Sequence, residues 1–244
     1  MSMIDTHSHI LYGIDDGSKT LEESLAILKQ MYQLGYTKII LTPHYMENTE
    51  YVANNRIKKE IVRKLREKLK EENILLELYL GNEVYLFETI IERIKSKDIF
   101  TMNQTNYLLV ELPLLEHLHT DLDLLFELIA SGVHIVLAHP ERYRIFLDNP
   151  KLIEKYTDMG ILLQGNLESF VGKYGKSSQK LAIRLLKQHK YFVLGSDIHR
   201  ENAKFFSRFS KIQKKLKNIV DDDYIDNLMY YNPQKIIDGV YDEN

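Results

Sequence analysis

Short hydrophobic runs alternate with longer amphipathic stretches along most of the chain. The runs are almost continuously apolar, which is typical of strands that are buried on both faces of a parallel sheet. Seven strands are predicted, over residues 3–6, 38–42, 75–81, 107–112, 134–138, 161–164 and 191–195. The stretches between them carry apolar residues at helical spacing and predict helices over residues 21–34, 52–70, 86–95, 122–129, 152–159, 178–187 and 206–219.

The repeated order of strand and then helix predicts an α/β fold with parallel strands inside and helices outside. The first helix has clear end signals, because Thr20 and Glu23 form a plausible capping box and Gly35 stops the helix. No repeat and no linker rich in Pro, Gly or Ser divides the sequence, so we expect one domain over residues 1–244. The pattern alone fits either an open doubly wound sheet or a closed barrel.

Residue types that bind metals follow the predicted strands. They lie at or just beyond the C-terminal end of nearly every strand, at His7, His9, His44, Glu83, Glu111, His139, Asp197 and His199. In a closed barrel all these ends open on one face, so residues far apart in sequence converge on one pocket, whereas an open sheet spreads them along a line. A shared metal site therefore favours the closed barrel.

Each of these positions also has a purely structural interpretation. The His-x-His spacing of residues 7 and 9 recurs at His117 and His119, for which we predict no metal binding. A carboxylate such as Glu83, at the end of an apolar run, is costly to bury without a partner and is often held in a salt bridge or a helix cap. The joint placement of so many positions, rather than any one of them, favours the metal site.

Two further segments lead into the same predicted pocket. Asp15 and Asp16 are compatible with a simple turn, but one of them is also a candidate ligand. Arg142 lies three residues beyond His139, where its planar, permanently charged side chain would suit two phosphate oxygens. The alternative for Arg142 is an ordinary surface ion pair with Glu141.

The composition narrows the chemistry. The chain has no Cys, so a thiolate nucleophile, a disulfide and a sulfur-ligated metal are excluded, and nitrogen and oxygen must hold any metal. Its formal net charge of -3 gives no long-range attraction to nucleic acid or to an anionic membrane, so positive charge used in binding must be local. No run of eighteen apolar residues and no signal peptide occurs, and we expect a cytoplasmic protein without membrane insertion.

Taken together, the motifs resemble the polymerase-and-histidinol-phosphatase (PHP) superfamily of trinuclear metal phosphoesterases. The resemblance is closest to the bacterial PHP-type protein tyrosine phosphatases of capsule and exopolysaccharide clusters. It is carried by DTHSHILYGIDDGSKTLEES, LTPHY, GNEVY, LLVELP, AHPERY, GNLESFVGKYGK and LGSDIH, in this order. The resemblance implies a distorted (β/α)7 barrel that holds three divalent ions, with manganese as the first candidate and iron or zinc as alternatives.

The resemblance also implies a role for each motif residue. The first ion would take His7, His9, Glu83 and Asp197, the second would share Glu83 and take Glu111 and His139, and the third would take Asp16, His44 and His199. Arg142 matches the phosphate-binding Arg of the family and, with His44 and His199, is predicted to be catalytic. Some members carry a second Arg after the last motif; Arg200 and Lys204 are the candidates here, and the sequence does not choose between them or exclude both.

The predicted activity is hydrolysis of phosphotyrosine by a metal-activated hydroxide, without a covalent enzyme intermediate. The resemblance implies that the substrate is a phosphotyrosine-bearing tail of a bacterial tyrosine kinase that controls capsular or exopolysaccharide synthesis. A small-molecule phosphatase of the same superfamily, acting for example on histidinol phosphate, is the main alternative, and a non-catalytic scaffold stabilised by metal is a further one. The spacing of Leu122, Leu125 and Ile129 suits an oligomer contact as well as an ordinary packed helix.

Overall fold

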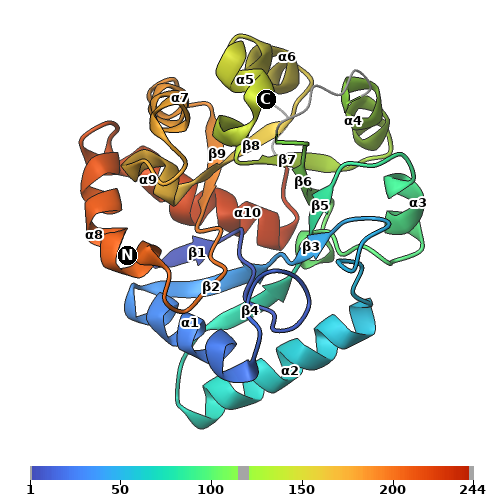
Figure 1. Cartoon of the computed structure of the whole chain (residues 1–244), viewed down its shortest axis with the longest axis vertical. Coiled ribbons are helices and arrows are strands. Elements are labelled where there is room, and N and C mark those ends of the chain that lie inside the picture. Colours follow the sequence, from blue (N-terminus) through green and yellow to red (C-terminus); the bar gives the residue numbers. More distant parts are fainter. Residues whose placement is uncertain (1, 115–120, 242–244) are drawn as a thin grey trace.

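A computed structural model gives the fold of the chain and describes residues 2–114 and 121–241. Figure 1 shows strands gathered in the middle of the molecule with helices arranged around them. Every strand pairing is parallel, as a chain of alternating strands and helices requires. His117 and His119 lie outside the described residues.

The strands form two hydrogen-bonded groups. The smaller group has the order β1-β2-β4, with bounds Met3–Asp5, Tyr36–Leu41 and Glu77–Leu80. The larger group has the order β3-β5-β6-β7-β8-β9, with bounds His44–Tyr45, Glu83–Tyr85, Tyr107–Glu111, His134–Ala138, Leu162–Asn166 and Tyr191–Gly195. Each of the seven predicted strands corresponds to one observed strand, and the short strands β3 and β5 were not predicted.

The two unpredicted strands follow a break in the pairing, because the chain leaves β4 and then continues into β5, as it leaves β2 and continues into β3. The break lies beside Pro43 of the neighbouring segment. Pro has no backbone N–H and therefore cannot donate a hydrogen bond to the adjacent strand. Two bonds bridge the gap: Gly81 N donates to Leu41 O at 2.9 Å and Glu83 N donates to Pro43 O at 3.1 Å. Beyond the break, His44 and Glu83 pair in register, so both arrive at the same place.

The ring closes between its first and last strands just beyond their ends. Ser8 forms an isolated parallel bridge with Ile198, where His9 N donates to Ile198 O and Asp197 N donates to His7 O, both at 2.9 Å. The fold is therefore a distorted barrel of β/α units, as the sequence predicts. Its irregular closure and the break near Pro43 are the distortions.

Seven helices lie near the predicted places, with bounds Leu21–Gln33 (α1), Asn55–Glu71 (α2), Ile90–Lys95 (α3), Asp121–Ala130 (α4), Leu152–Asp158 (α6), Lys176–Lys187 (α7) and Lys204–Lys217 (α8). The capping box of α1 forms in a modified way, because Thr20 accepts from Glu23 N but the Glu23 carboxylate accepts from Lys19 N. The predicted starts of α2 and α3 are wrong by a few residues, since Asn54 caps α2 and α3 begins only after Thr89.

Several short helices are absent from the predicted pattern. Three follow strands: η2 (Pro140–Arg142), α5 (Arg144–Asp148) and η3 (Leu167–Val171); η1 (Met102–Gln104) precedes β6; and α9 (Asp222–Asp226), η4 (Asn227–Tyr231) and α10 (Asn232–Asp238) end the described chain. Figure 1 shows α10 behind the strands, in the middle of the molecule. None of the described helices is both long and apolar enough to cross a membrane.

The hydrophobic core has two parts. The larger lies between the strands and the surrounding helices, and it includes Leu125, while Leu122 and Ile129 pack against it from partly buried positions. The smaller fills the barrel interior, where Ile4, Ile40, Leu109, Val136 and Val193 meet Ile236 and Ile237 of α10. Helix α10 thus closes the end of the barrel opposite the C-terminal ends of the strands.

Candidate metal centre

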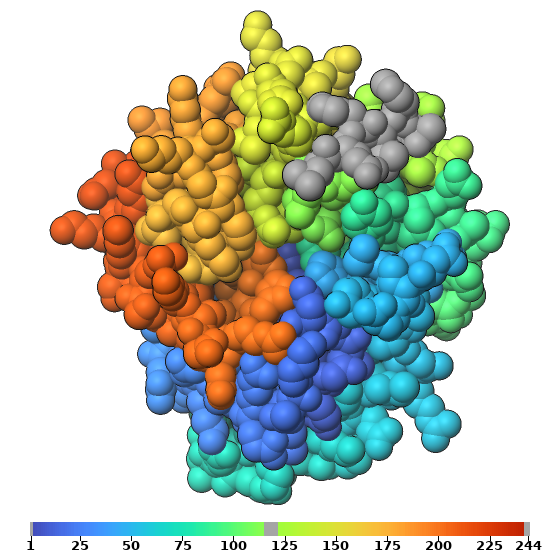
Figure 2. All heavy atoms as spheres, viewed as in Figure 1, coloured from blue at the N-terminus to red at the C-terminus, as the bar shows by residue number. Residues whose placement is uncertain are grey.

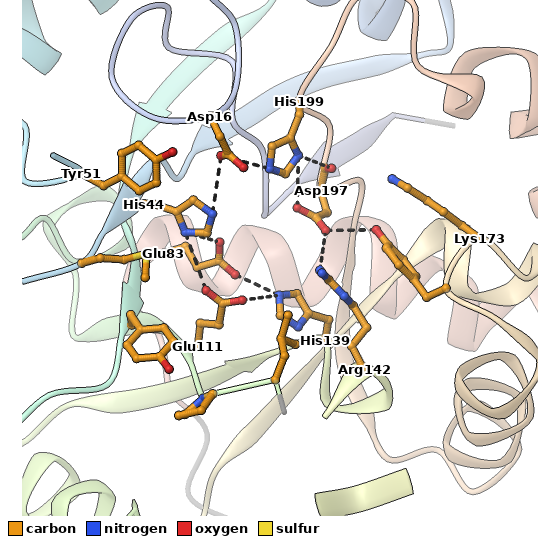
Figure 3. Close-up of a pocket in the computed structure, with 15 residues that line it drawn as sticks. Asp16, His44, Tyr51, Glu83, Glu111, His139, Arg142, Lys173, Asp197 and His199 are labelled. Carbon is orange, nitrogen blue, oxygen red and sulfur yellow. Dashed lines mark hydrogen bonds and ion pairs between the residues drawn. The ribbon is translucent and has the colours of Figure 1, made fainter. Parts of the chain in front are cut away.

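A pocket of about 540 Å³ opens at the C-terminal ends of the strands. It is lined by residues from nearly every β/α unit, which Figure 3 shows pointing toward one another. Figure 2 shows the same face of the whole molecule. The convergence predicted from the strand ends is therefore what the described residues form.

His7 and His9 lie on the innermost side of this cluster, fully buried. The Nε2 atoms of both rings lie 3.2 Å from one Glu83 oxygen, and they lie 3.6 and 3.5 Å from one Asp197 oxygen. His7, His9 and Asp197 place their ligand atoms within 4.8 Å of one another. A cation could bind all three together with Glu83.

Glu83 lies at the centre of the cluster. Its second oxygen lies 3.1 Å from His139 Nε2, which is itself 3.6 Å from Glu111. His44 Nδ1 lies 3.1 Å from Glu83 and 3.8 Å from Glu111 on the other side. One carboxylate therefore faces two groups of potential ligands, which is the arrangement of a bridging ligand.

A third group lies toward the mouth of the pocket. Asp16 is half exposed, and its carboxylate lies 3.7 Å from His44 Nε2 and 3.5 Å from His199 Nε2. Together with His9 these side chains offer four ligand atoms within 4.8 Å of one another. All nine residues that the resemblance nominated as ligands thus lie in one cluster.

Local backbone geometry turns two of these side chains into the pocket. His139 and Asp197 directly follow or lie close to the ends of β7 and β9, and both have left-handed backbones with φ of 33° and 52°. This conformation costs a residue with a side chain of the order of 1–3 kcal/mol. Gly195 allows the end of β9 to approach the segment that follows β1, because a Cβ there would lie 2.7 Å from the His7 Cβ.

Hydrogen bonds from a second layer of residues hold the imidazole rings. Asp15 is buried, accepts from His9 Nδ1 at 2.8 Å and also accepts from the backbone N of His44 and Gly17. Gln164 Oε1 lies 2.9 Å from His7 Nδ1. Asp15 was predicted as part of a turn or, as the alternative to Asp16, as a ligand, and Gln164 was predicted only as the end of a strand.

Arg142 enters the pocket and pairs with Asp197, its Nη1 lying 3.0 Å from the carboxylate. The alternative pairing with Glu141 is wrong, because Glu141 is fully buried and accepts from Asn166 N, Ser169 and Tyr191. These bonds fix the short helix η2 on which Arg142 is carried. The guanidinium therefore lies beside the proposed ligands, as the sequence predicts.

The structure places the two other basic candidates elsewhere. Arg200 donates to Gly17 O at 2.7 Å and lies 3.6 Å from Glu23, while Lys204 is the first residue of α8. Neither residue lines the pocket as the described residues form it. Lys173 does line it, beside Tyr174, whose ring lies 4.5 Å from the Arg142 guanidinium carbon. The GKYGK motif could have indicated Lys173 as a pocket residue, but the sequence analysis did not single out this lysine.

The electrostatics of the pocket suit cations. Burial, reinforced by the positive charge of Arg142, lowers the pKa of His139 to about 4, and burial together with His9 lowers that of His199 to about 4. Burial and the charge of Glu83 raise the pKa of Glu111 well above its ordinary value. Against the opposing effect of burial, the carboxylates raise the pKa of His7 to about 9 and that of His9 well above its ordinary value. Crowded carboxylates thus attract positive charge to the buried rings, and a divalent ion would supply that charge in place of the protons.

A buried ring nitrogen without a hydrogen bond also indicates that these side chains fit metal ions. His44 Nδ1 is buried and faces Glu83 and Glu111 without an aligned hydrogen bond. Such a buried ring nitrogen is costly unless a partner satisfies it, and a cation between it and the two carboxylates would do so. The ligands are nitrogen and oxygen, which suits manganese, iron or zinc.

Fold and site together define a PHP-type barrel with a cluster of histidines and carboxylates at the C-terminal ends of its strands. The chain belongs to the CpsB/CapC family: the family model described as capsular polysaccharide synthesis, CpsB/CapC, matches residues 3–238.

Relatives and solved structures agree with this assignment. The chain is 31% identical over 210 residues to the tyrosine-protein phosphatase CpsB of Streptococcus pneumoniae, covering 83% of this chain and 85% of that protein. It is 29% identical over 205 residues to the tyrosine-protein phosphatase YwqE of Bacillus subtilis, covering 84% and 80%. A crystal structure from work on YwqE and CpsB, described as metal-dependent tyrosine phosphatases, superposes with a TM-score of 0.86 at 24% identity, covering 98% and 96% of the two chains.

Proposed function

We propose that the protein is a metal-dependent tyrosine-protein phosphatase, a phosphoric monoester hydrolase that acts on phosphotyrosine in proteins. The observation that carries the proposal is the convergence of nine potential metal ligands around Glu83, with Arg142 beside them. Membership of the CpsB/CapC family and relatives that are named tyrosine-protein phosphatases support the same activity. The family match over residues 3–238 supports one catalytic domain.

Three divalent ions, manganese first, are proposed to occupy the cluster. We assign His7, His9, Glu83 and Asp197 to the first ion, Glu83, Glu111 and His139 to the second, and Asp16, His44 and His199 to the third. The groups of ligand atoms within 4.8 Å support this division, although His9 also lies near the third group and His44 near Glu83 and Glu111. Asp15 and Gln164 hold the rings of His9 and His7 from behind, as second-layer partners of metal ligands commonly do.

Divalent ions in such a cluster supply an activated water at neutral pH and neutralise charge on the phosphoryl oxygens. The protein supplies the positioning. Arg142 would orient two phosphate oxygens through the two parallel N–H groups of its guanidinium. His44 and His199 lie at the mouth of the pocket and would act in catalysis by holding the third ion close to the incoming phosphate. The tyrosyl leaving group has a pKa of about 10 and therefore needs less help from a general acid than an alkyl alcohol does.

The physiological substrate is proposed to be the phosphotyrosine-bearing tail of a bacterial tyrosine kinase that regulates capsular or exopolysaccharide synthesis in the cytoplasm. The family description and the names of the relatives support this context. The pocket wall at Tyr51, Pro113 and Leu114 would accept a phenyl ring beside the phosphate site.

The test is turnover by purified protein loaded with manganese. We expect rapid release of phosphate from a tyrosine-phosphorylated peptide and a loss of at least about a hundredfold in His44→Ala, which removes a proposed ligand. Glu22→Gln, an exposed acidic residue at the start of α1, is the matched control and should retain full activity. Hydrolysis of histidinol phosphate with no activity on the peptide would instead indicate the small-molecule alternative.

A further inference from the structure

The charge of this chain is distributed very unevenly. Residues 173–217 carry 13 Lys and Arg against two acidic residues, whereas the rest of the chain carries 19 Lys and Arg against 33 Asp and Glu. The formal net charge of -3 therefore hides a strongly basic segment on an otherwise acidic molecule. Positive charge gathered in this way creates a local potential that attracts an acidic partner.

The basic segment forms two neighbouring helices of the barrel. Helices α7 and α8 follow the adjacent strands β8 and β9, and both pack against η3. Neither helix contains an acidic residue. Figure 2 shows both helices, in orange to red-orange, along one side of the face on which the pocket opens. We call this surface, made by the Lys and Arg side chains of α7 and α8, the basic surface.

The basic side chains form a stripe along each helix. In α7 they lie at residues 176, 180, 184 and 187, and in α8 at residues 204, 208, 211 and 215, so each stripe follows one helical face. Among the described residues, ion pairs are made by Arg208 with Glu168 and by Lys217 with Asp222. The other eight cations of the two helices, Lys176, Lys180, Arg184, Lys187, Lys204, Lys211, Lys214 and Lys215, have no acidic partner in that part of the chain.

The basic surface is continuous with the pocket. Lys173 and Tyr174 line the pocket, and α7 begins two residues later; His199 lines it too, and α8 begins five residues later. The N-terminal ends of both helices therefore lie at the rim, and the stripes run from there down the side of the barrel. Their lengths of 12 and 14 residues correspond to about 18 and 21 Å.

From these observations we propose that the basic surface docks an acidic polypeptide segment that flanks the phosphotyrosine in the substrate protein. This proposal rests on the proposed function and adds a second binding region to it. An extended peptide advances about 3.3 Å per residue, so roughly six acidic or phosphorylated residues beside the reactive tyrosine would span a stripe. An anionic membrane is a less suitable partner, because none of the exposed large hydrophobic side chains in the described part of the chain lies on α7 or α8 to enter a bilayer.

The experiment measures binding without turnover. Two fluorescent peptides carry the same central phosphonomethyl-phenylalanine, a phosphotyrosine analogue that cannot be hydrolysed, flanked by six Glu or by six Gln. With manganese-loaded protein at low salt we expect the acidic peptide to bind about tenfold more tightly than the neutral one, and we expect that difference to shrink as salt screens the surface. The triple variant Lys176→Glu, Lys180→Glu and Lys211→Glu should abolish the difference.

The control carries the same change of net charge on other faces, through Lys64→Glu, Lys70→Glu and Lys151→Glu, and should keep the tenfold preference. The basic-surface variant should also retain turnover of p-nitrophenyl phosphate, which shows that it is folded and that its pocket is intact. Equal preference for the acidic peptide in both triple variants would overturn the proposal. The proposal would also be overturned if the basic-surface variant alone lost binding to phosphatidylglycerol vesicles while it kept its preference for the acidic peptide.

Failure of the proposed function would look different. It would leave p-nitrophenyl phosphate and the phosphotyrosine peptide unhydrolysed by the unmodified protein, whatever the binding measurements show.

Discussion

Lys58 shows how far one residue can depart from its local pattern. It lies in α2 beside Ile57, yet the lysine is fully buried and the isoleucine is 51% exposed. The ammonium donates to Asn82 Oδ1 at 2.8 Å and lies 5.1 Å from the centre of the Phe100 ring. Burial lowers the pKa of Lys58 from 10.5 to about 7, against the opposing effect of Asp98.

This burial makes stability depend on pH. Between about pH 7 and 10.5 the unfolded chain holds a proton on Lys58 that the folded chain has released, so the destabilisation from this residue is largest below pH 7 and declines as the pH rises. We predict that Lys58→Met raises the Tm by roughly 2 to 8 °C at pH 6 and by clearly less at pH 9. Thermal unfolding of the unmodified protein and of Lys58→Met from pH 6 to pH 9 measures this gain in Tm.

The neighbouring substitution Lys59→Met is the control, because Lys59 is exposed, and it should shift the Tm little at either pH. A gain in Tm for Lys58→Met that stayed constant from pH 6 to pH 9 would contradict the titration of Lys58.

At the scale of elements, α10 is the least expected part of the fold. The sequence predicts no regular structure after residue 219, but the structure has three short helices there, and the last of them seals the barrel interior. Ile236 is fully buried against the inward-facing side chains of the strands, on the side away from the pocket. The C-terminal helix therefore supports the strands that carry the candidate ligands without contributing a ligand itself.

We predict that Ile236→Ala lowers the free energy of unfolding by about 2 to 5 kcal/mol, the usual range for a buried Ile cut back to Ala. Urea denaturation measures the loss. Because the substitution lies at the opposite end of the barrel, turnover at low temperature should stay within about twofold of the unmodified protein. Val240→Ala, at a position that is 48% exposed, should cost less than about 0.5 kcal/mol.

Retention of full stability by the Ile236 variant would mean that α10 does not hold the barrel closed. Loss of activity at a temperature where the variant remains folded would place α10 nearer to the chemistry than the structure does.

At the scale of the whole molecule, the candidate metal centre joins segments from His7 to His199 in one cluster. Asp16, Glu83, Glu111 and Asp197 bring four carboxylates together, and Arg142 is the cation that pairs with one of them. Folding gathers these negative charges, which favours binding of divalent ions to the folded chain over the unfolded one. Bound ions should therefore stabilise the entire barrel rather than one loop.

We predict that chelation lowers the Tm at pH 8 and that added manganese restores it. With manganese at about a hundred times its dissociation constant the gain is about 2.7 kcal/mol, or roughly 5 to 11 °C for a chain of this size. Calorimetry of chelated and reloaded protein tests this. Glu83→Gln removes the central carboxylate and should show much less response to manganese, whereas an equal response in both proteins would argue against Glu83 as a shared ligand.

The sequence by itself determined the order of strands and helices and the residue types at the strand ends. Both depend on local pattern: hydrophobic spacing reports which face is buried, and motifs such as AHPERY and LGSDIH keep their ligands a few residues apart. Those signals were enough to favour the barrel and to nominate eight of the nine residues that converge around Glu83, while the family resemblance chose Asp16 over Asp15.

Tertiary structure alone decided how the ring closes at Ser8 and Ile198, how β3 and β5 continue β2 and β4 after a break, and which residues support the ligands. Asp15 and Gln164 acquire their roles only when the rings of His9 and His7 arrive beside them. It also turned Arg200 away from the pocket and brought Lys173 into it. The physical reason is the same in each case: these contacts join segments distant in sequence, and local spacing contains no information about which distant partner will satisfy a given polar atom.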